Sequence, residues 1–174
     1  MKNHFRLFDY CLDTIDEALS KKMMIEMNKI LKRNTTDEEN PRYNVGDFKI
    51  VPNKIGLINV INTSAPEDVE NDLDELLKWY QSLKKIKLED IIDFHYRFER
   101  IHPFGDGNGR VGRMIMFKEC LKHNIVPILI TDEYESFYYR GLKEWKNEPG
   151  YLIDTCLNGQ DILKKHLDYY NIKY

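Results

Sequence analysis

The chain has 174 residues, of which 42% are hydrophobic and 32% charged, and its net charge is −3. This length fits a single domain over residues 1–174, and the weak charge excludes a general electrostatic attraction to nucleic acid or anionic membranes. Three scattered cysteines, no signal-like start and no apolar run of about 18 residues predict a cytoplasmic protein with no membrane partner.

The first half of the chain is predicted to contain two helices, a loop and a hairpin. Apolar residues at helical spacing predict helices over residues 5–15 and 23–31. The polar stretch 34–44 contains Pro41 and predicts a loop. Apolar, often β-branched residues at 48–51 and 55–61 flank Pro52-Asn53-Lys54, which predicts a short β-hairpin.

The second half is predicted to be helical. Helical spacing predicts helices over residues 64–83 and 88–101, from Gly109 onward, over 133–147 and over 151–169. The helix that starts at Leu88 should end at Ile101, because Pro103 and the glycines after it cannot continue a helix. The predicted fold class is therefore all-α, a helical bundle with one β-hairpin.

The connection between two of these helices carries the strongest chemical signal. Residues 102–113 read HPFGDGNGRVGR. A helix start presents unpaired N–H groups and the positive end of the helix dipole, which together bind anions. Gly107 and Gly109 let the backbone approach a ligand closely. Arg110 and Arg113 can reach the same side of the helix start, and two guanidinium groups there suit several phosphate oxygens.

The same segment also contains groups suited to catalysis. Asp106 supplies a hard oxygen ligand for Mg²⁺, which takes one or two carboxylates together with substrate phosphates. Asn108 can donate a hydrogen bond to a phosphoryl oxygen. His102 titrates near neutral pH and is placed to take a proton from an incoming hydroxyl. Phosphoryl and nucleotidyl transfer need these parts.

Other interpretations of the loop fit less well. No strand precedes it and Arg110 occupies the third glycine position, which excludes a dinucleotide-binding fingerprint. It lacks the Gly-Lys-Ser/Thr ending of a P-loop, and Phe117 stands where a calcium loop needs a glutamate. His95 lacks a third metal ligand nearby and is interpreted as a core or supporting histidine.

At these residues the chain resembles the Fic family, whose motif is HxFx(D/E)GNGRxxR. Every specified position matches, from His102 and Phe104 to Arg113. The similarity of layout extends over about residues 20–151. Residues 46–49 resemble the entry to the family's hairpin flap, and Tyr138-Tyr139 resemble its tyrosine pair near the nucleotide.

The resemblance implies transfer of AMP from ATP to a Ser, Thr or Tyr hydroxyl of a target protein. His102 would be the base, Phe104 would anchor the loop in the core, and Asp106 would hold Mg²⁺. The implied nucleotide-binding residues are Asn53, Lys54, Ile55, Gly56, Gly107, Asn108, Gly109, Arg110, Arg113, Tyr138 and Tyr139. The target protein would bind along the hairpin by strand addition. Intact Gly109 and Arg110 argue against the Doc-like kinase variant.

Several alternatives stay open. Residues 35–40, from Thr35 to Asn40, match the family's inhibitory motif (S/T)xxxE(G/N) formally, but we interpret this match as chance because it lies in a polar loop. The inhibitor would then be a separate, antitoxin-like protein, or it would be lost or left out of this chain, or the enzyme would run unrestrained. The alternative functions are a de-AMPylating hydrolase, with Glu39 as the candidate glutamate, a transferase for another nucleotide donor, and a non-enzymatic nucleotide-binding regulatory module.

Overall fold

The structure is a computed structural model that describes residues 2–56 and 61–174. Its α-helices in chain order are α1 (Lys2–Asp13), α2 (Lys21–Lys32), α3 (Val69–Ser82), α4 (Leu88–Ile101), α5 (Asn108–Lys122), α6 (Glu135–Glu144) and α7 (Gly150–Tyr169). Short 3-10 turns are η1 (Pro41–Tyr43), η2 (Pro66–Asp68) and η3 (Asp132–Tyr134). Strands β1 (Lys54–Ile55) and β2 (Ile61–Asn62) pair antiparallel, Lys54 opposite Asn62. The predicted all-α bundle with one hairpin is confirmed.

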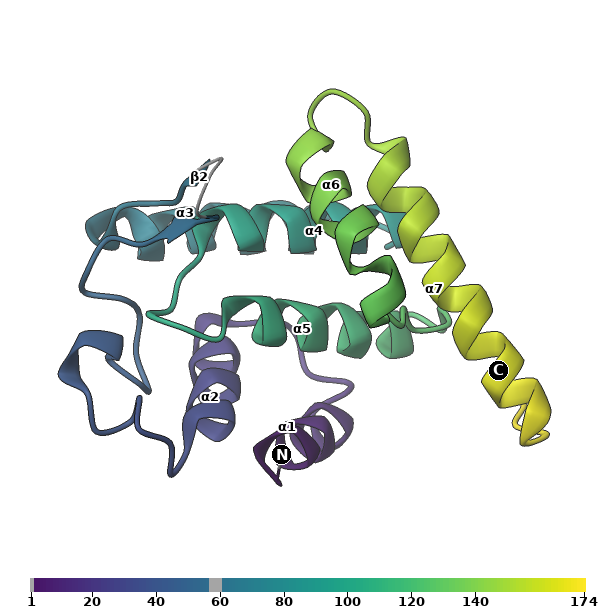
Figure 1. The fold of residues 1–174 in the computed structure, drawn as a ribbon, viewed down its shortest axis with the longest axis horizontal. Helices are drawn as coiled ribbons and strands as arrows, with labels where there is room; N and C mark the ends of the chain where they lie inside the picture. Colours follow the sequence, from purple (N-terminus) through teal and green to yellow (C-terminus); the bar gives the residue numbers. More distant parts are fainter. Residues whose placement is uncertain (1, 57–60) are drawn as a thin grey trace.

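Helices α4 and α5 form the centre of the bundle (Figure 1). Helices α1 and α2 pack on α5, and α3 packs on α4. The main core lies between these helices, and a smaller cluster under α6 and α7 is formed by Ile92, Tyr138, Leu152 and Cys156. The hairpin and the α4–α5 connection lie at one end of the central pair, and α7 lies at the other (Figure 1).

Local sequence signals explain where α4 ends and where α5 begins. Helix α4 ends at Ile101, as predicted, and His102 caps it in the left-handed conformation with φ of 54°. The His102 backbone N–H donates to the Phe98 carbonyl at 2.9 Å, while Pro103 prevents another helical turn. Gly107, with φ of 88°, immediately precedes α5 and supplies the left-handed turn that L-residues rarely adopt.

The predicted hairpin was partly wrong. Residues 48–51 form no strand, because Phe48 and Lys49 are both buried and the Lys49 N–H donates to the Pro103 carbonyl at 2.8 Å. The backbone of this segment is therefore bonded to the connection between α4 and α5, residues 102–107, which we call the active loop, and not to a strand partner. The expected second strand over 55–61 was also wrong, because Ile55 lies in β1 and pairs with Ile61 in β2. Its residues 57–60 lie outside the described residues.

The remaining differences are at helix ends. The helices predicted at 64–83 and 133–147 each begin with a 3-10 turn, so α3 starts at Val69 and α6 covers Glu135–Glu144. In the described part of the chain, none of the helices has the length and apolar character needed to cross a membrane.

Candidate active site

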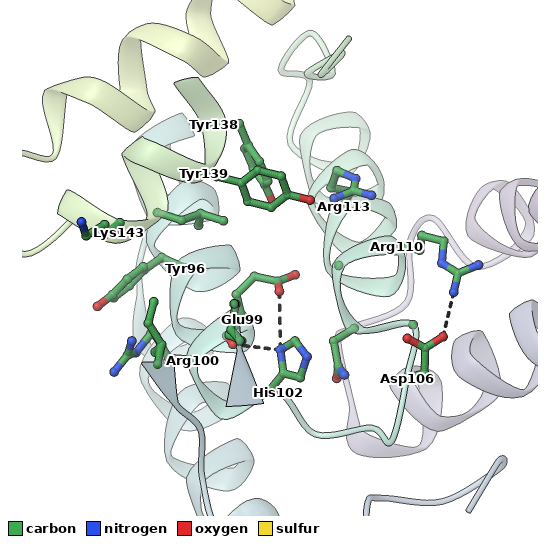
Figure 2. A pocket seen from close by; sticks show the side chains of 17 residues that line it. Tyr96, Glu99, Arg100, His102, Asp106, Arg110, Arg113, Tyr138, Tyr139 and Lys143 are labelled. Atoms are coloured by element: carbon green, nitrogen blue, oxygen red, sulfur yellow. Dashed lines mark hydrogen bonds and ion pairs between the residues drawn. The ribbon is translucent and has the colours of Figure 1, made fainter. Parts of the chain in front are cut away.

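A cavity of about 600 Å³ opens between the end of α4, the start of α5, helix α6 and the hairpin. Figure 2 shows His102 facing this cavity from one side, with Arg113 and Asp106 on the other walls. Its lining residues are Ile55, Gly56, Ile61, Tyr96, Glu99, Arg100, His102, Asp106, Gly107, Asn108, Gly109, Arg110, Arg113, Tyr138, Tyr139, Leu142 and Lys143. The structure therefore brings most of the predicted site residues to one cavity of a size that suits a small ligand.

The environment of His102 favours a neutral imidazole with one free nitrogen. Nδ1 lies 3.2 Å from the Glu99 carbonyl oxygen, which can only accept, so Nδ1 carries the hydrogen. Nε2 then keeps its lone pair. Burial lowers the pKa of His102 to about 4, with the charge of Lys49 adding to the effect. The ring is consequently in its proton-accepting form at neutral pH.

Phe104 and Asn108 fix the loop around this histidine. The Phe104 side chain is 0% exposed and packs beside Phe48 and Phe98, which confirms its predicted role as an anchor. The Asn108 side chain, also buried, accepts from the Phe104 N–H and donates to the Phe104 carbonyl, both at 2.8 Å. Its amide therefore closes the loop, and binding of phosphate by Asn108 stays a prediction.

Asp106 lies at the exposed end of the loop within a cluster of charges. Its carboxylate pairs with the buried ammonium of Lys32 and, at 3.0 Å, with Arg110. Lys32 also pairs with Asp37. Burial alone would raise the pKa of Asp106, but the hydrogen bond and charge of Lys32 hold it below its usual value. Asp106 is thus an anion at neutral pH.

The two arginines reach the cavity in different directions. Arg110 points toward Asp106, whereas Arg113 lies near Tyr138 and Tyr139 (Figure 2). The Arg113 guanidinium lies 5.9 Å from the centre of the Tyr138 ring. The tyrosines also differ: Tyr138 is buried and bonded to His95 at 2.5 Å, while Tyr139 is 53% exposed at the rim.

The predicted hairpin residues divide into two groups. Ile55 and Gly56 line the cavity, but Asn53 and Lys54 do not. The Asn53 amide donates to the Phe104 carbonyl at 2.8 Å and its oxygen accepts from Lys49 and Thr63. We call Lys49, Asn53 and Thr63 the hairpin anchor, because they join the base of the hairpin to the active loop.

Lys49 is the cation of the hairpin anchor. Its ammonium donates to Asn53 Oδ1 at 2.8 Å, Thr63 Oγ1 at 2.9 Å and the Ile101 carbonyl at 3.1 Å. Burial lowers its pKa to about 8. These contacts connect both ends of the hairpin to the end of α4, which places the hairpin over the cavity.

Sequence reasoning missed several residues of this site. Tyr96, Glu99, Arg100, Leu142 and Lys143 all line the cavity. Glu99 had a usable signal, because residues three apart on a helix share a face and Glu99 precedes His102 by that spacing. Leu142 and Lys143 of α6 had no local signal, because tertiary packing brings them to the cavity.

Comparisons with known proteins identify the family of the chain. The model of the Fic/DOC family matches residues 18–120. Protein adenylyltransferase Fic of Nematostella vectensis is 33% identical over 84 residues, covering 46% of this chain and 19% of that protein. A probable protein adenylyltransferase of Aquifex aeolicus (strain VF5) is 29% identical over 98 residues, covering 56% and 30%. The chain thus spans a minor part of the length of these relatives.

Solved structures show the same fold. A Fic family protein from Desulfovibrio desulfuricans G20 superposes with a TM-score of 0.76 at 23% identity, covering 99% of this chain and 54% of that one. A Fic domain-containing signaling protein from Bacteroides thetaiotaomicron gives a TM-score of 0.73 at 23% identity, covering 97% and 65%. Since the family model spans more than half of the sequence and its motif forms the cavity wall, the chain belongs to the Fic/DOC family.

Proposed function

We propose that this chain is a protein adenylyltransferase, which transfers AMP from ATP to a Ser, Thr or Tyr hydroxyl of a target protein. The observation that carries the proposal is the neutral His102, with Nε2 free, at a cavity that also contains Arg110 and Arg113. The names of the relatives in this family support the same reaction.

In the proposed reaction, His102 Nε2 takes the proton of the target hydroxyl. The hydroxyl oxygen forms a bond to the α-phosphorus of ATP, and the bond from that phosphorus to the bridging oxygen breaks. Pyrophosphate leaves with the electron pair. The backbone N–H groups at the start of α5 and the arginines of α5 stabilise the charge on the phosphate oxygens.

The residues at the loop fit a magnesium ion that is bound mainly by substrate. Asp106 is ionised and exposed, and Mg²⁺ usually takes one or two carboxylates with phosphates and water. No cluster of three or more His, Cys, Asp or Glu residues suited to a metal occurs in the described ranges. Asp106 would thus hold Mg²⁺ together with the nucleotide, and the ion would neutralise phosphate charge.

The hairpin supports binding of a target protein. Ile55 lines the cavity and lies in a short strand, so an extended target segment can add to this edge beside His102. We expect no nucleic-acid partner, because the net charge is −3. A separate inhibitory protein remains part of the proposal. Residues 35–40 form turns and no helix, and Glu39 is exposed and away from the cavity lining.

The test is labelling of protein by ATP and Mg²⁺. Covalent label from [α-³²P]ATP, on a lysate protein or on the chain itself, supports AMP transfer, and label from [γ-³²P]ATP alone supports a kinase. Label from neither, with a nucleotide analogue still bound, supports a regulatory module. His102→Ala should abolish the α-label while the analogue still binds, and His166→Ala, on the exposed face of α7, should behave as wild type. Persistent labelling by His102→Ala would refute the role of the base.

Two variations of the labelling assay test the alternative activities. Other labelled nucleoside triphosphates test for a different donor. Release of AMP from a labelled target, after removal of ATP, tests for the de-AMPylating hydrolase.

A further inference from the structure

Glu99 is a buried acid beside the histidine of the cavity. It lies on the last turn of α4 and is 8% exposed. Its Oε2 lies 3.8 Å from His102 Nδ1, and its backbone carbonyl is 3.2 Å from the same nitrogen. Figure 2 shows both acceptors of Glu99 directed at one ring nitrogen. Oε1 has no hydrogen-bond partner among the residues that the structure describes.

Packing holds the Glu99 carboxyl in this position. A methyl group on Gly112 would lie 2.6 Å from Oε1, so the glycine leaves space that the carboxyl occupies. Arg113 is near enough to favour the carboxylate, but no ion pair between them is found within the described residues. Burial raises the pKa of Glu99 to about 7. A purely structural residue here would not need an ionisable group, because an uncharged side chain fills the same space at less cost.

We propose that the Glu99 carboxylate is a positioning residue that faces His102 Nδ1–H and offsets the positive charge of the ring when Nε2 accepts the hydroxyl proton. This inference rests on the proposed function. The proton moves from the target hydroxyl to Nε2, and the new positive charge is shared over the imidazolium. The carboxylate 3.8 Å from Nδ1 stabilises that cation through a medium with little water.

The expected kinetic effect follows from the loss of one charge. An opposite charge at such a distance changes a pKa by about 1 to 3 units, so loss of Glu99 should slow transfer by about tenfold or more. Glu99→Gln keeps the shape and removes the charge. Its kcat/KM for labelling from [α-³²P]ATP should fall at pH 8, while affinity for a non-hydrolysable ATP analogue stays within about twofold, because no phosphate contact is removed.

The pH profile separates this role from a structural one. The charged and titratable groups around Glu99 are His95, His102, Arg113, Tyr138 and Tyr139. His102 also lies near Lys49 and Asp106. Wild-type kcat/KM should rise through about pH 7, as Glu99 ionises. In Glu99→Gln this rise should disappear, and Glu89→Gln, exposed at the start of α4, should follow the wild type.

A second measurement does not depend on transfer. In NMR titrations, the His102 ring signals of the wild type should respond near pH 7 as well as near pH 4, and Glu99→Gln should keep the lower step alone. Signals are assigned with His102→Ala, and thermal unfolding verifies the fold of each variant. Identical ring titrations in wild type and Glu99→Gln would overturn the inference, as would a loss confined to ATP affinity. If the wild type transfers no label, the proposed function fails, while the NMR comparison still decides whether Glu99 is coupled to His102.

Discussion

Replacing Asn108 by alanine removes both hydrogen bonds that hold the active loop to the start of α5. The Phe104 N–H, bonded at 2.8 Å, is left buried without a partner, whereas the Phe104 carbonyl keeps the hydrogen bond from the Asn53 amide. A buried backbone group without a partner costs about 1 to 3 kcal/mol, and the lost hydrogen bond to the carbonyl adds about 1 kcal/mol. We therefore expect the free energy of unfolding to fall by about 2 to 4 kcal/mol, or Tm by about 5 to 15 °C for a chain of this size.

The assay is urea and thermal unfolding by circular dichroism, without nucleotide. A suitable control is Asn158→Ala, because the buried Asn158 amide nitrogen has no hydrogen-bond partner in the described part of the chain. If the Asn108 amide served phosphate binding alone, Asn108→Ala would unfold at the wild-type urea concentration and lose nucleotide affinity only. That result would refute our interpretation that the Asn108 amide holds the active loop in place through its hydrogen bonds to Phe104.

Three further predictions concern charges and packing around the cavity. The raised pKa of Glu99 contributes stability that is present below about pH 4.5 and is lost as pH rises through about 7. Urea unfolding should therefore show wild type losing about 3 kcal/mol between pH 4 and 8 relative to Glu99→Gln. Lys32→Met leaves Asp37 and Asp106 without their shared cation, so the free energy of unfolding should fall by about 1.5 to 3 kcal/mol. Calorimetry with Mg²⁺ and an ATP analogue should show tighter metal binding by this variant, because the ammonium that competes for Asp106 is gone. Gly112→Ala should displace the Glu99 carboxyl and lower the stability measured by thermal unfolding by about 1 to 3 kcal/mol. Labelling from [α-³²P]ATP should fall as it does in Glu99→Gln. A folded Gly112→Ala variant that labels as well as the wild type would contradict the role of Glu99.

Much of the fold could be predicted because its signals are local. Helix α4 has a strong apolar face and a proline beyond its end, so its bounds were predicted as the structure has them. The strand residues of the hairpin could not be predicted, because burial of Phe48 and Lys49 depends on the distant Pro103 and Phe104. A lysine next to a phenylalanine gives no sign in sequence that both side chains are buried.

The site also combines residues with a local sequence signal and residues that only the fold brings together. The loop from His102 to Arg113 is contiguous, so its chemistry could be interpreted directly, and the structure gathers it at one cavity. The roles of Asn53 and Asn108 were less accessible, because an amide suits a phosphate and a backbone carbonyl equally well. Lys32 lies far along the chain from its partner Asp106, and α-helical packing alone brings the two together.

In the proposed function, the hairpin anchor separates the residues that would bind a target from the residues that would carry out the reaction. Lys49, Asn53 and Thr63 all lie outside the paired strands, yet they fasten both strand ends to the helix that carries His102. Exposed strand residues such as Lys54 and Asn62 can therefore be exchanged without moving the base. If the chain acts on a target protein as proposed, an engineer who wishes to redirect it to a new target should vary those strand positions and leave the three anchoring side chains untouched.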